Sequence, residues 1–142
     1  MRIVVGADDE GAVADTVVEE LRRRGHDVRV LDRGEWPDVA TEVARTVAAG
    51  DADQGVLFCW TGTGTSMAAN KVPGVRAALA WDPWIAAGAR KWNDANVLVM
   101  SLKRTDPENA KQIVDGWLSV EAPDPDEAAN IARLGELDAE RH

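Results

Sequence analysis

The feature that most constrains the fold is a regular alternation of short apolar runs with longer amphipathic segments. The short runs are rich in β-branched residues and predict five strands, over residues 2–6, 28–31, 55–58, 75–80 and 97–100. Apolar residues at helical spacing predict six helices, over residues 11–24, 37–50, 66–70, 83–92, 107–120 and 126–140. Short apolar strands that alternate with helices form a parallel sheet covered on both faces. The sequence therefore predicts an α/β fold, a three-layer sandwich with a five-stranded parallel sheet.

The chain is long enough for one domain with a substantial core. We find no internal repeat or interdomain linker, so residues 1–122 are expected to form a single α/β domain. The remaining segment, 123–142, has too few apolar positions to form a second domain. We expect it to be a helical arm that packs on a partner subunit.

Charge and cysteine content exclude several classes of function. The net charge of −9 opposes non-specific nucleic-acid binding, because phosphates are repelled. No apolar run approaches the ~20 residues that a membrane helix needs, and the first residues show no signal-peptide pattern. The single cysteine cannot form an internal disulfide, which fits a reducing compartment. We therefore expect a cytoplasmic protein that binds neither nucleic acid nor a membrane.

In a parallel sheet, ligands bind outside the carboxyl ends of the strands, where the strand order reverses. The candidate site residues therefore follow the strand ends at Gly6, Leu31, Phe58, Ala80 and Met100. Any single tryptophan is best explained as core filling. Five of them nevertheless fall near segments expected to line a pocket: Trp36, Trp60, Trp81, Trp84 and Trp92.

Three consecutive acids, Asp8, Asp9 and Glu10, follow the first strand. Glu10 is best explained as a partner of a helix N-terminus, whereas Asp8 at the strand end is placed to bind a ligand hydroxyl. The loop lacks the Gly-x-Gly-x-x-Gly fingerprint and carries negative charge where a pyrophosphate would lie. This loop argues against a nucleotide cofactor.

The segment after the third strand is the most informative. Cys59 ends the strand, and Gly62 and Gly64 in the following turn permit backbone conformations that let several N–H groups converge. Such a nest stabilises an oxyanion and favours the thiolate form of a nearby cysteine. A lone cysteine is more often an inert buried thiol, but this position favours a reactive one.

A thiolate beside an oxyanion nest suits covalent acyl transfer or proton abstraction next to a carbonyl. Acyl transfer by cysteine usually enlists a histidine. The chain has only His26, expected at the opposite side of the sheet, and His142 at the terminus. Proton abstraction, with an enediolate held by backbone N–H groups, needs fewer partners and is favoured.

Several segments combine into a specific pattern. They are Asp8, Cys59-x-Thr61-Gly62-x-Gly64-x-Ser66, Ala68-Ala69-Asn70-Lys71-Val72-Pro73-Gly74-Val75-Arg76-Ala77-Ala78 and Asn93-Asp94-Ala95-Asn96-Val97-Leu98. From Met1 to about Trp117 the chain resembles the ribose-5-phosphate isomerase B and galactose-6-phosphate isomerase family. The resemblance implies a flavodoxin-like, Rossmann-like sandwich that forms a homodimer or homotetramer with each active site between two subunits. It also implies aldose–ketose isomerisation through a cis-enediolate, without a metal or cofactor.

The resemblance also implies residue roles. Cys59 matches the family's base, Asp8 and Thr61 match residues that handle sugar hydroxyls and ring opening, and Asn93 matches a ligand-binding asparagine. The backbone of one loop matches the anion hole for the enediolate: Gly62, Thr63, Gly64, Thr65 and Ser66.

The departures from the family fall on groups that open the sugar ring or hold phosphate. Asp9, Trp81 and Trp92 stand where the family usually has histidines, Lys103 replaces an arginine, and Arg133 is the one basic match in the arm. A phosphate group carries about −1.5 to −2 charges near pH 7, so Asp9 opposes its binding. We therefore predict an altered substrate, which is an unphosphorylated, shorter, deoxy or amino sugar.

Two alternatives stay open. The chain is an ordinary ribose-5-phosphate isomerase if Lys103 and nearby arginines hold the phosphate. It is a non-catalytic homologue, which binds a sugar-like ligand or partners an active subunit, if the missing histidines abolish turnover. The retained Cys59 and glycine loop favour an enzyme.

Overall fold

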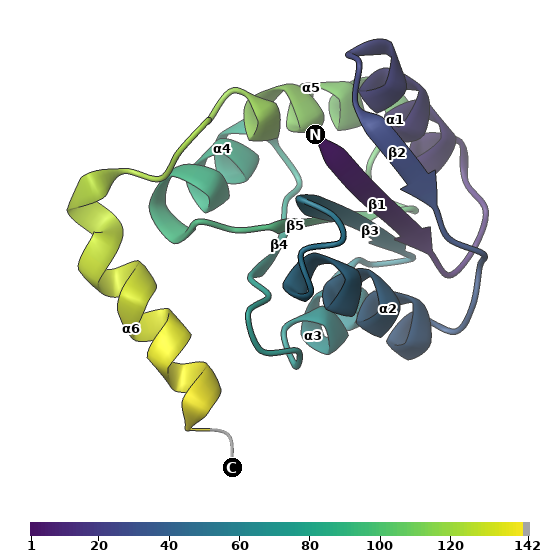
Figure 1. Ribbon diagram of the computed structural model, residues 1–142. Coiled ribbons are helices and arrows are strands. Elements are labelled where there is room, and N and C mark those ends of the chain that lie inside the picture. Colours follow the sequence, from purple (N-terminus) through teal and green to yellow (C-terminus); the bar gives the residue numbers. More distant parts are fainter. Residues whose placement is uncertain (141–142) are drawn as a thin grey trace.

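The computed structural model describes residues 1–140 and contains the predicted parallel sheet (Figure 1). Its strands are β1 (Arg2–Ala7), β2 (Asp27–Val30), β3 (Gln54–Cys59), β4 (Ala77–Leu79) and β5 (Val97–Ser101). They are all parallel and follow the order β2-β1-β3-β5-β4. The predicted fold class, a three-layer α/β sandwich, is confirmed.

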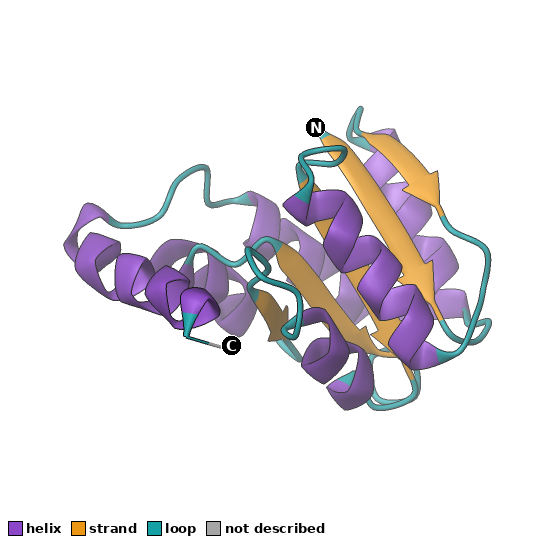
Figure 2. Cartoon of the chain, turned by 60° about the horizontal axis from the view of Figure 1, so that its bottom comes forward, coloured by secondary structure: helices purple, strands orange, loops and turns teal. Residues whose placement is uncertain are grey.

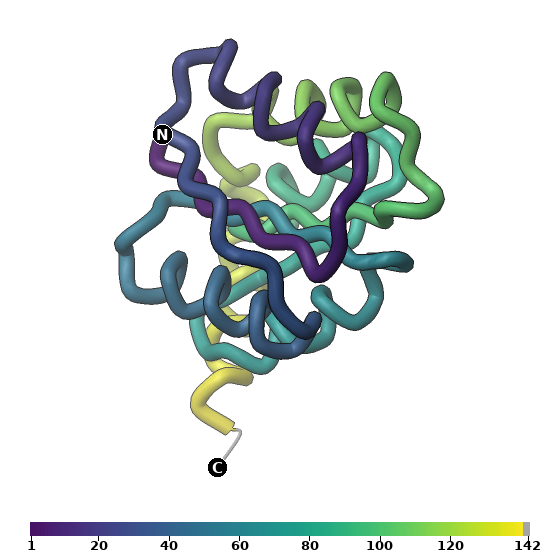
Figure 3. Tube along the Cα trace, turned by 90° about the vertical axis from the view of Figure 1, so that its right-hand side faces the viewer, coloured from purple at the N-terminus to yellow at the C-terminus, as the bar shows by residue number. Residues whose placement is uncertain are grey.

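Helices cover both faces of the sheet, as Figures 2 and 3 show. One layer contains α1 (Ala12–Arg23), α4 (Pro83–Asn93) and α5 (Pro107–Leu118), and the other contains α2 (Trp36–Ala48) and α3 (Thr63–Ala69). The connections through α1 and α4 lead toward the β2 edge of the sheet, and those through α2 and α3 lead toward the β4 edge. Since such crossovers are right-handed, the two directions place their helices on opposite faces. No helix of the described chain is long and apolar enough to span a bilayer.

Burial along the strands follows their place in the sheet. Every residue of β3 and β5 is buried, as expected for central strands of a parallel sheet, whereas only Val28 of β2 is buried at the edge. β4 is shorter than the predicted strand over 75–80. Residues 75 and 76 lie before the strand in irregular backbone, where the Arg76 N–H donates to Oδ1 of Asn96 at 2.8 Å.

Gly116 brings α5 against the start of α4. A Cβ at this position would lie 3.0 Å from the Cα and carbonyl carbon of Pro83, and closer to its carbonyl oxygen. We expect Gly116→Ala to lower the free energy of unfolding by about 1–3 kcal/mol, because the two helices must move apart. Urea unfolding measures the change.

Gly135→Ala in α6 is the matched control for this substitution. Nothing lies within 4 Å of a Cβ at Gly135, so alanine should be neutral or slightly stabilising there. Equal destabilisation by the two variants would contradict a role for close helix packing at Gly116.

The C-terminal segment projects from the body of the molecule (Figure 1). After a short 3-10 turn at Pro125–Glu127, α6 (Ala128–Ala139) has no buried residue, and Leu134 and Leu137 are 43% and 42% exposed. The predicted packing of this arm on a partner subunit stays a prediction.

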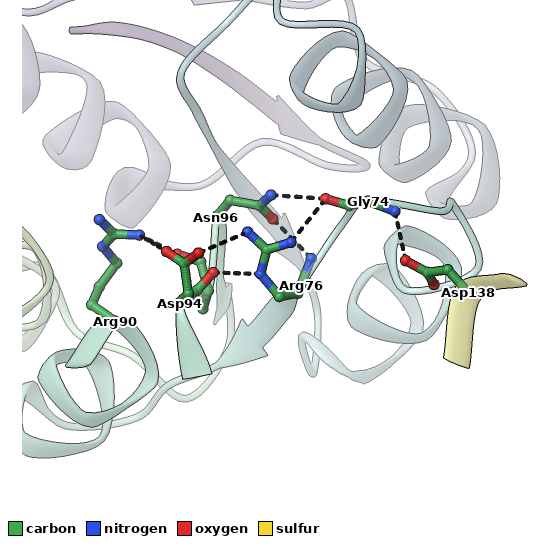
Figure 4. Close-up of polar contacts among 7 residues, drawn as sticks. Gly74, Arg76, Arg90, Asp94, Asn96 and Asp138 are labelled. Atoms are coloured by element: carbon green, nitrogen blue, oxygen red, sulfur yellow. Dashed lines mark hydrogen bonds and ion pairs between the residues drawn. The ribbon is translucent and has the colours of Figure 1, made fainter. Parts of the chain in front are cut away.

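A polar network at the amino ends of the strands ties the arm to the body (Figure 4). Asp138 of α6 accepts a hydrogen bond from the Gly74 N–H at 2.8 Å, and the Gly74 carbonyl accepts one from Asn96 at 3.0 Å. Arg76 donates through Nε to the Asp94 carbonyl at 2.6 Å and through Nη2 to its carboxylate at 3.3 Å. The network therefore holds two segments side by side: the turn at residues 94–96, which follows α4, and the loop at residues 74–76, which binds α6.

Candidate active site

The carboxyl ends of β1 and β3 lie side by side, and the chain leaves them toward opposite faces of the sheet. Such a point leaves a crevice above the sheet. The β1–β3 ladder continues past β1, since the N–H of Asp8 donates to the Phe58 carbonyl at 3.3 Å. A cavity of about 440 Å³ lies here, lined by Asp8, Trp36, Cys59, Trp60, Thr61, Thr63, Gly64 and Met67. The topology thus brings residues of the first and third predicted loops together.

Two hydrogen-bond donors hold the sulfur of Cys59. This residue is only 5% exposed, and its Sγ accepts from the Gly62 N–H at 3.2 Å and from the Thr65 hydroxyl at 3.3 Å. Thr65 is completely buried, so its hydroxyl has a fixed position. Donors aimed at a sulfur stabilise negative charge on it, and the arrangement therefore suits a thiolate.

Gly62 shapes the turn between Cys59 and α3. It adopts a left-handed conformation with φ +82°, and a Cβ would lie 2.5 Å from Cδ1 of Leu79 and 3.3 Å from the backbone carbon of Met100. The chain enters α3 directly after this turn, at Thr63 rather than at the predicted Ser66. Only glycine satisfies both the backbone angle and the available space.

The early start of α3 decides which N–H groups of the predicted anion hole are free. The N–H of Thr63 donates to Oγ1 of Thr61 at 3.3 Å, and the N–H of Ser66 donates to the Gly62 carbonyl at 3.2 Å. The N–H groups of Gly64 and Thr65 belong to the first helical turn, where no helix carbonyl is available. Within residues 1–140 these two groups donate no hydrogen bond. Thr65 is completely buried and Gly64 is partly exposed, so the N–H of Gly64 is the one that is accessible to an anion.

Asp8 presents an unsatisfied acceptor at the cavity. Its Oδ1 is buried and has no hydrogen-bond partner in the described part of the chain. Burial raises the pKa of Asp8, and the negative charges of Asp9 and Glu35 raise it further. A buried oxygen without a partner is placed to accept a hydrogen bond from a ligand hydroxyl.

Asp9 is engaged within the protein. Its Oδ2 accepts from the indole N–H of Trp60 at 3.0 Å, and its Oδ1 accepts from the Glu10 N–H at 2.8 Å. These hydrogen bonds, that of Trp60 first, lower the pKa of Asp9. The ammonium of Lys103 lies over the ring of Trp60, 4.7 Å from the ring centroid. Asp9 and Lys103 are therefore joined through Trp60.

The two neighbouring aspartates should affect stability with opposite pH dependence. Because the pKa of folded Asp8 is raised, its charge destabilises the fold as pH rises above the unfolded value of 3.8. Asp8→Asn should therefore raise the Tm at pH 7, and this gain should disappear near pH 3, where the carboxyl of the wild type is protonated. Thermal melts from pH 3 to 8 measure this difference.

Asp9→Asn is the matched control for the melts. The pKa of folded Asp9 is lowered, so its charge stabilises the fold above pH 3.8, and this contribution is lost as the pH falls through the folded value. The control should lower the Tm at neutral pH. The assignment of Asp8 as a partly buried carboxylate with an unpaired oxygen is wrong if both variants lower the Tm equally.

Several predicted site residues lie away from Cys59 in the same chain. Asn93 ends α4, which runs back to the amino ends of the strands, and it lines a different cavity beside Arg76 and α6. Trp92 packs edge-to-face on Trp84 with ring centroids 5.6 Å apart, and Arg133 pairs with acids of α6. A single subunit therefore does not bring these residues to the sulfur.

The expectation that five tryptophans gather around one pocket is wrong for a single subunit. Only Trp36 and Trp60 line the Cys59 cavity. Trp81 and Trp84 are 64% and 69% exposed beside or on α4, because this helix lies on the opposite face of the sheet from α3.

The histidines do not supply a partner for Cys59. The ring of His26 lies 3.1 Å from the amino group of Met1, directly before β2 and thus at the amino ends of the strands. His142 lies outside the described residues. The geometry supports the argument against acyl transfer assisted by His26.

Sequence reasoning missed two contributions to the site. The hydroxyl of Thr65 contacts the Cys59 sulfur, although only the backbone of this residue was expected to act. Met67 is 63% exposed and lines the cavity. The spacing of Met67 from Thr63 could have predicted this position. Residues four apart lie on the same face of a helix, and Met67 follows Thr63 by four residues in α3.

The fold and the site together define a class of protein: a three-layer α/β enzyme with a cysteine thiol at the switch point of its sheet. The model of the Ribose/Galactose Isomerase family matches residues 3–134. The chain therefore belongs to the ribose/galactose isomerase family, and the predicted family and type of enzyme are confirmed.

Individual relatives agree with this assignment. Ribose-5-phosphate isomerase B of Escherichia coli is 40% identical in an alignment 128 residues long, and the match covers 84% of this chain and 85% of the relative. D-erythrulose-4-phosphate isomerase of Pectobacterium atrosepticum is 34% identical, and the match covers 95% of this chain and 93% of the relative. The structure of ribose-5-phosphate isomerase B from Clostridium thermocellum superposes with a TM-score of 0.94 at 33% identity, over the whole of both chains.

Proposed function

We propose that this chain is an aldose–ketose isomerase that moves a proton between C1 and C2 of a short sugar phosphate through an enediolate. The observation that carries the proposal is the Cys59 sulfur, held by the Gly62 N–H and the Thr65 hydroxyl at the base of a cavity. A thiolate in this position is a base beside the two unpaired N–H groups of α3. The class of reaction follows from these groups and from the family.

In the proposed step, the Cys59 thiolate takes the proton from C2 of the open-chain aldose. The electrons of the broken C–H bond form the C1–C2 double bond of the enediolate, and the carbonyl π electrons move to O1. The N–H group of Gly64 binds that oxygen as its charge develops. The proton on O2 passes to O1, and the Cys59 thiol returns its proton to C1 as the electrons of the C1–C2 double bond form the new C–H bond. The electron pair left on O2 closes the C2 carbonyl and gives the ketose. Asp8 and Thr61 bind hydroxyls of the substrate, and with ribose 5-phosphate, the candidate that forms a ring, they assist ring opening.

We propose that Trp92, Asn93 and Arg133 act on the active site of a partner subunit. Within one chain they lie away from Cys59, at the other edge of the sheet or on the projecting arm. A homodimer or homotetramer with shared sites gives them access to a substrate. The single cysteine, without a disulfide partner, fits the reducing cytoplasm as the place of action.

A four-carbon sugar phosphate is the substrate that we favour. The cavity offers few polar side chains for the hydroxyls of a longer sugar. A relative similar over 95% of this chain is named for erythrulose 4-phosphate. Ribose 5-phosphate is the second candidate, supported by the 40% identity to the Escherichia coli enzyme.

Isotope exchange tests the proposed function. The purified chain is incubated in deuterium oxide with erythrulose 4-phosphate, ribose 5-phosphate, or the unphosphorylated sugars, and NMR follows deuterium at the carbon next to the carbonyl. We expect fastest exchange and product formation with the four-carbon phosphate. A clear preference for ribose 5-phosphate would establish the second candidate. Ligand binding without any exchange would overturn catalysis and favour a non-catalytic homologue.

A further inference from the structure

Trp60 is the one aromatic side chain of the Cys59 cavity that is tied to both neighbouring loops. Its indole N–H donates to Asp9 in the loop after β1, at 3.0 Å. The Lys103 ammonium, in the loop after β5, lies 4.7 Å from its ring centroid. Since β3 lies between β1 and β5, the ring reaches across the carboxyl ends of three adjacent strands.

The backbone around Trp60 is fixed as well. Its carbonyl accepts hydrogen bonds from the Ser101 hydroxyl at 2.5 Å and from the Lys103 N–H at 3.2 Å. The side chain is nevertheless 56% exposed, so it owes its position to these contacts and not to burial. A large ring held in this way forms a rigid wall, because swinging out would break the bond to Asp9 and the contact with Lys103.

The cavity beside this wall has a distinct distribution of polarity. Its polar side chains are Asp8 in the loop after β1, Thr61 in the turn after Cys59, and Thr63 at the start of α3. The other walls are apolar and are formed by Trp36, Trp60 and Met67. A ligand that places its carbonyl at Cys59 must direct the rest of its chain past an aromatic ring. Each added carbon with its hydroxyl then needs a polar partner that these walls lack.

We propose that Trp60, clamped by Asp9 and Lys103, is the residue that limits the length of the sugar chain and selects four-carbon over five-carbon phosphates. The inference rests on the proposed function and deepens it. Asp9 acts here as a positioning residue, which holds the indole in place through its carboxylate. A fixed aromatic wall rejects the extra carbon of a longer substrate by taking up its volume.

The test compares erythrulose 4-phosphate with ribulose 5-phosphate, two phosphorylated ketoses that differ by one carbon. Values of kcat and KM are measured for the full chain and for Trp60→Gly, Trp60→Phe and Asp9→Asn. In Trp60→Gly we expect the ratio of kcat/KM for the five-carbon over the four-carbon substrate to rise by about 10–100-fold, mainly through KM. Asp9→Asn should raise the ratio by less, and Trp60→Phe should change it least because a ring remains.

Trp36→Gly is the matched control, since Trp36 also lines the cavity but is not tied to Asp9 or Lys103. It should change kcat/KM for both substrates by similar factors. The inference is overturned if Trp60→Gly leaves the ratio unchanged, or if Trp36→Gly raises it equally. Such a result, with normal isotope exchange in the wild type, would leave the proposed function standing. Absence of exchange in the wild type would instead overturn both.

Discussion

Cys59→Ala is expected to lower kcat by about three orders of magnitude while the fold is retained, because the variant lacks the base that moves the proton. The sulfur lies at the carboxyl end of β3, where the Gly62 N–H and the Thr65 hydroxyl both donate to it. Neither donor can itself accept a proton from carbon. Steady-state kinetics and deuterium exchange with the preferred substrate measure the loss.

Two controls separate chemistry from structure in this experiment. The Tm of Cys59→Ala should fall only slightly, since the deleted sulfur is small and lies at the edge of the core. Thr65→Val removes one donor to the sulfur and should lower kcat by about tenfold, whereas Thr65→Ser keeps the hydroxyl and most of the activity. Full activity of Cys59→Ala would show that another group is the base.

Gly62→Ala is expected to reduce both stability and activity. The left-handed backbone costs alanine about 1–2 kcal/mol, and the contact with Leu79 and the Met100 backbone adds about 1–3 kcal/mol. Any relief of this clash moves the N–H that holds the Cys59 sulfur, so kcat should also fall by about 100-fold or more. Urea unfolding and steady-state kinetics give the two quantities.

Gly25→Ala is the matched control for this position. Gly25 has φ +88°, close to the angle of Gly62, but nothing lies within 4 Å of a Cβ there. It should therefore show only the cost of the backbone angle, with unchanged kcat because Gly25 follows α1, away from the cavity. If both variants lose the same stability and keep full activity, the packing argument for Gly62 does not hold.

Most of the fold could be predicted from the sequence because its signals are local. Periodicity of apolar residues identified every strand and helix, and most boundaries differ from the structure by one or two residues. The clear exception is α3, which begins at Thr63, directly after Gly62, and not at the predicted Ser66. The packing of Gly62 against Leu79 and the Met100 backbone, which are far along the chain, determines where this helix begins.

The sequence by itself determined the α/β class, the position of Cys59 at a strand end and the glycine-rich turn that follows it. These features depend on residues that are close in the sequence. The spacing of apolar residues and the backbone preferences of glycine therefore reveal them. Only the tertiary structure decided that Asp9 binds Trp60, that Thr65 faces the sulfur, and that Asn93 lies away from it. Such pairings depend on strand order and on which face each helix covers, because these bring together side chains up to 51 residues apart. The alternation of short strands and helices thus predicted the sheet, and the order of its strands brought the residues of the site together.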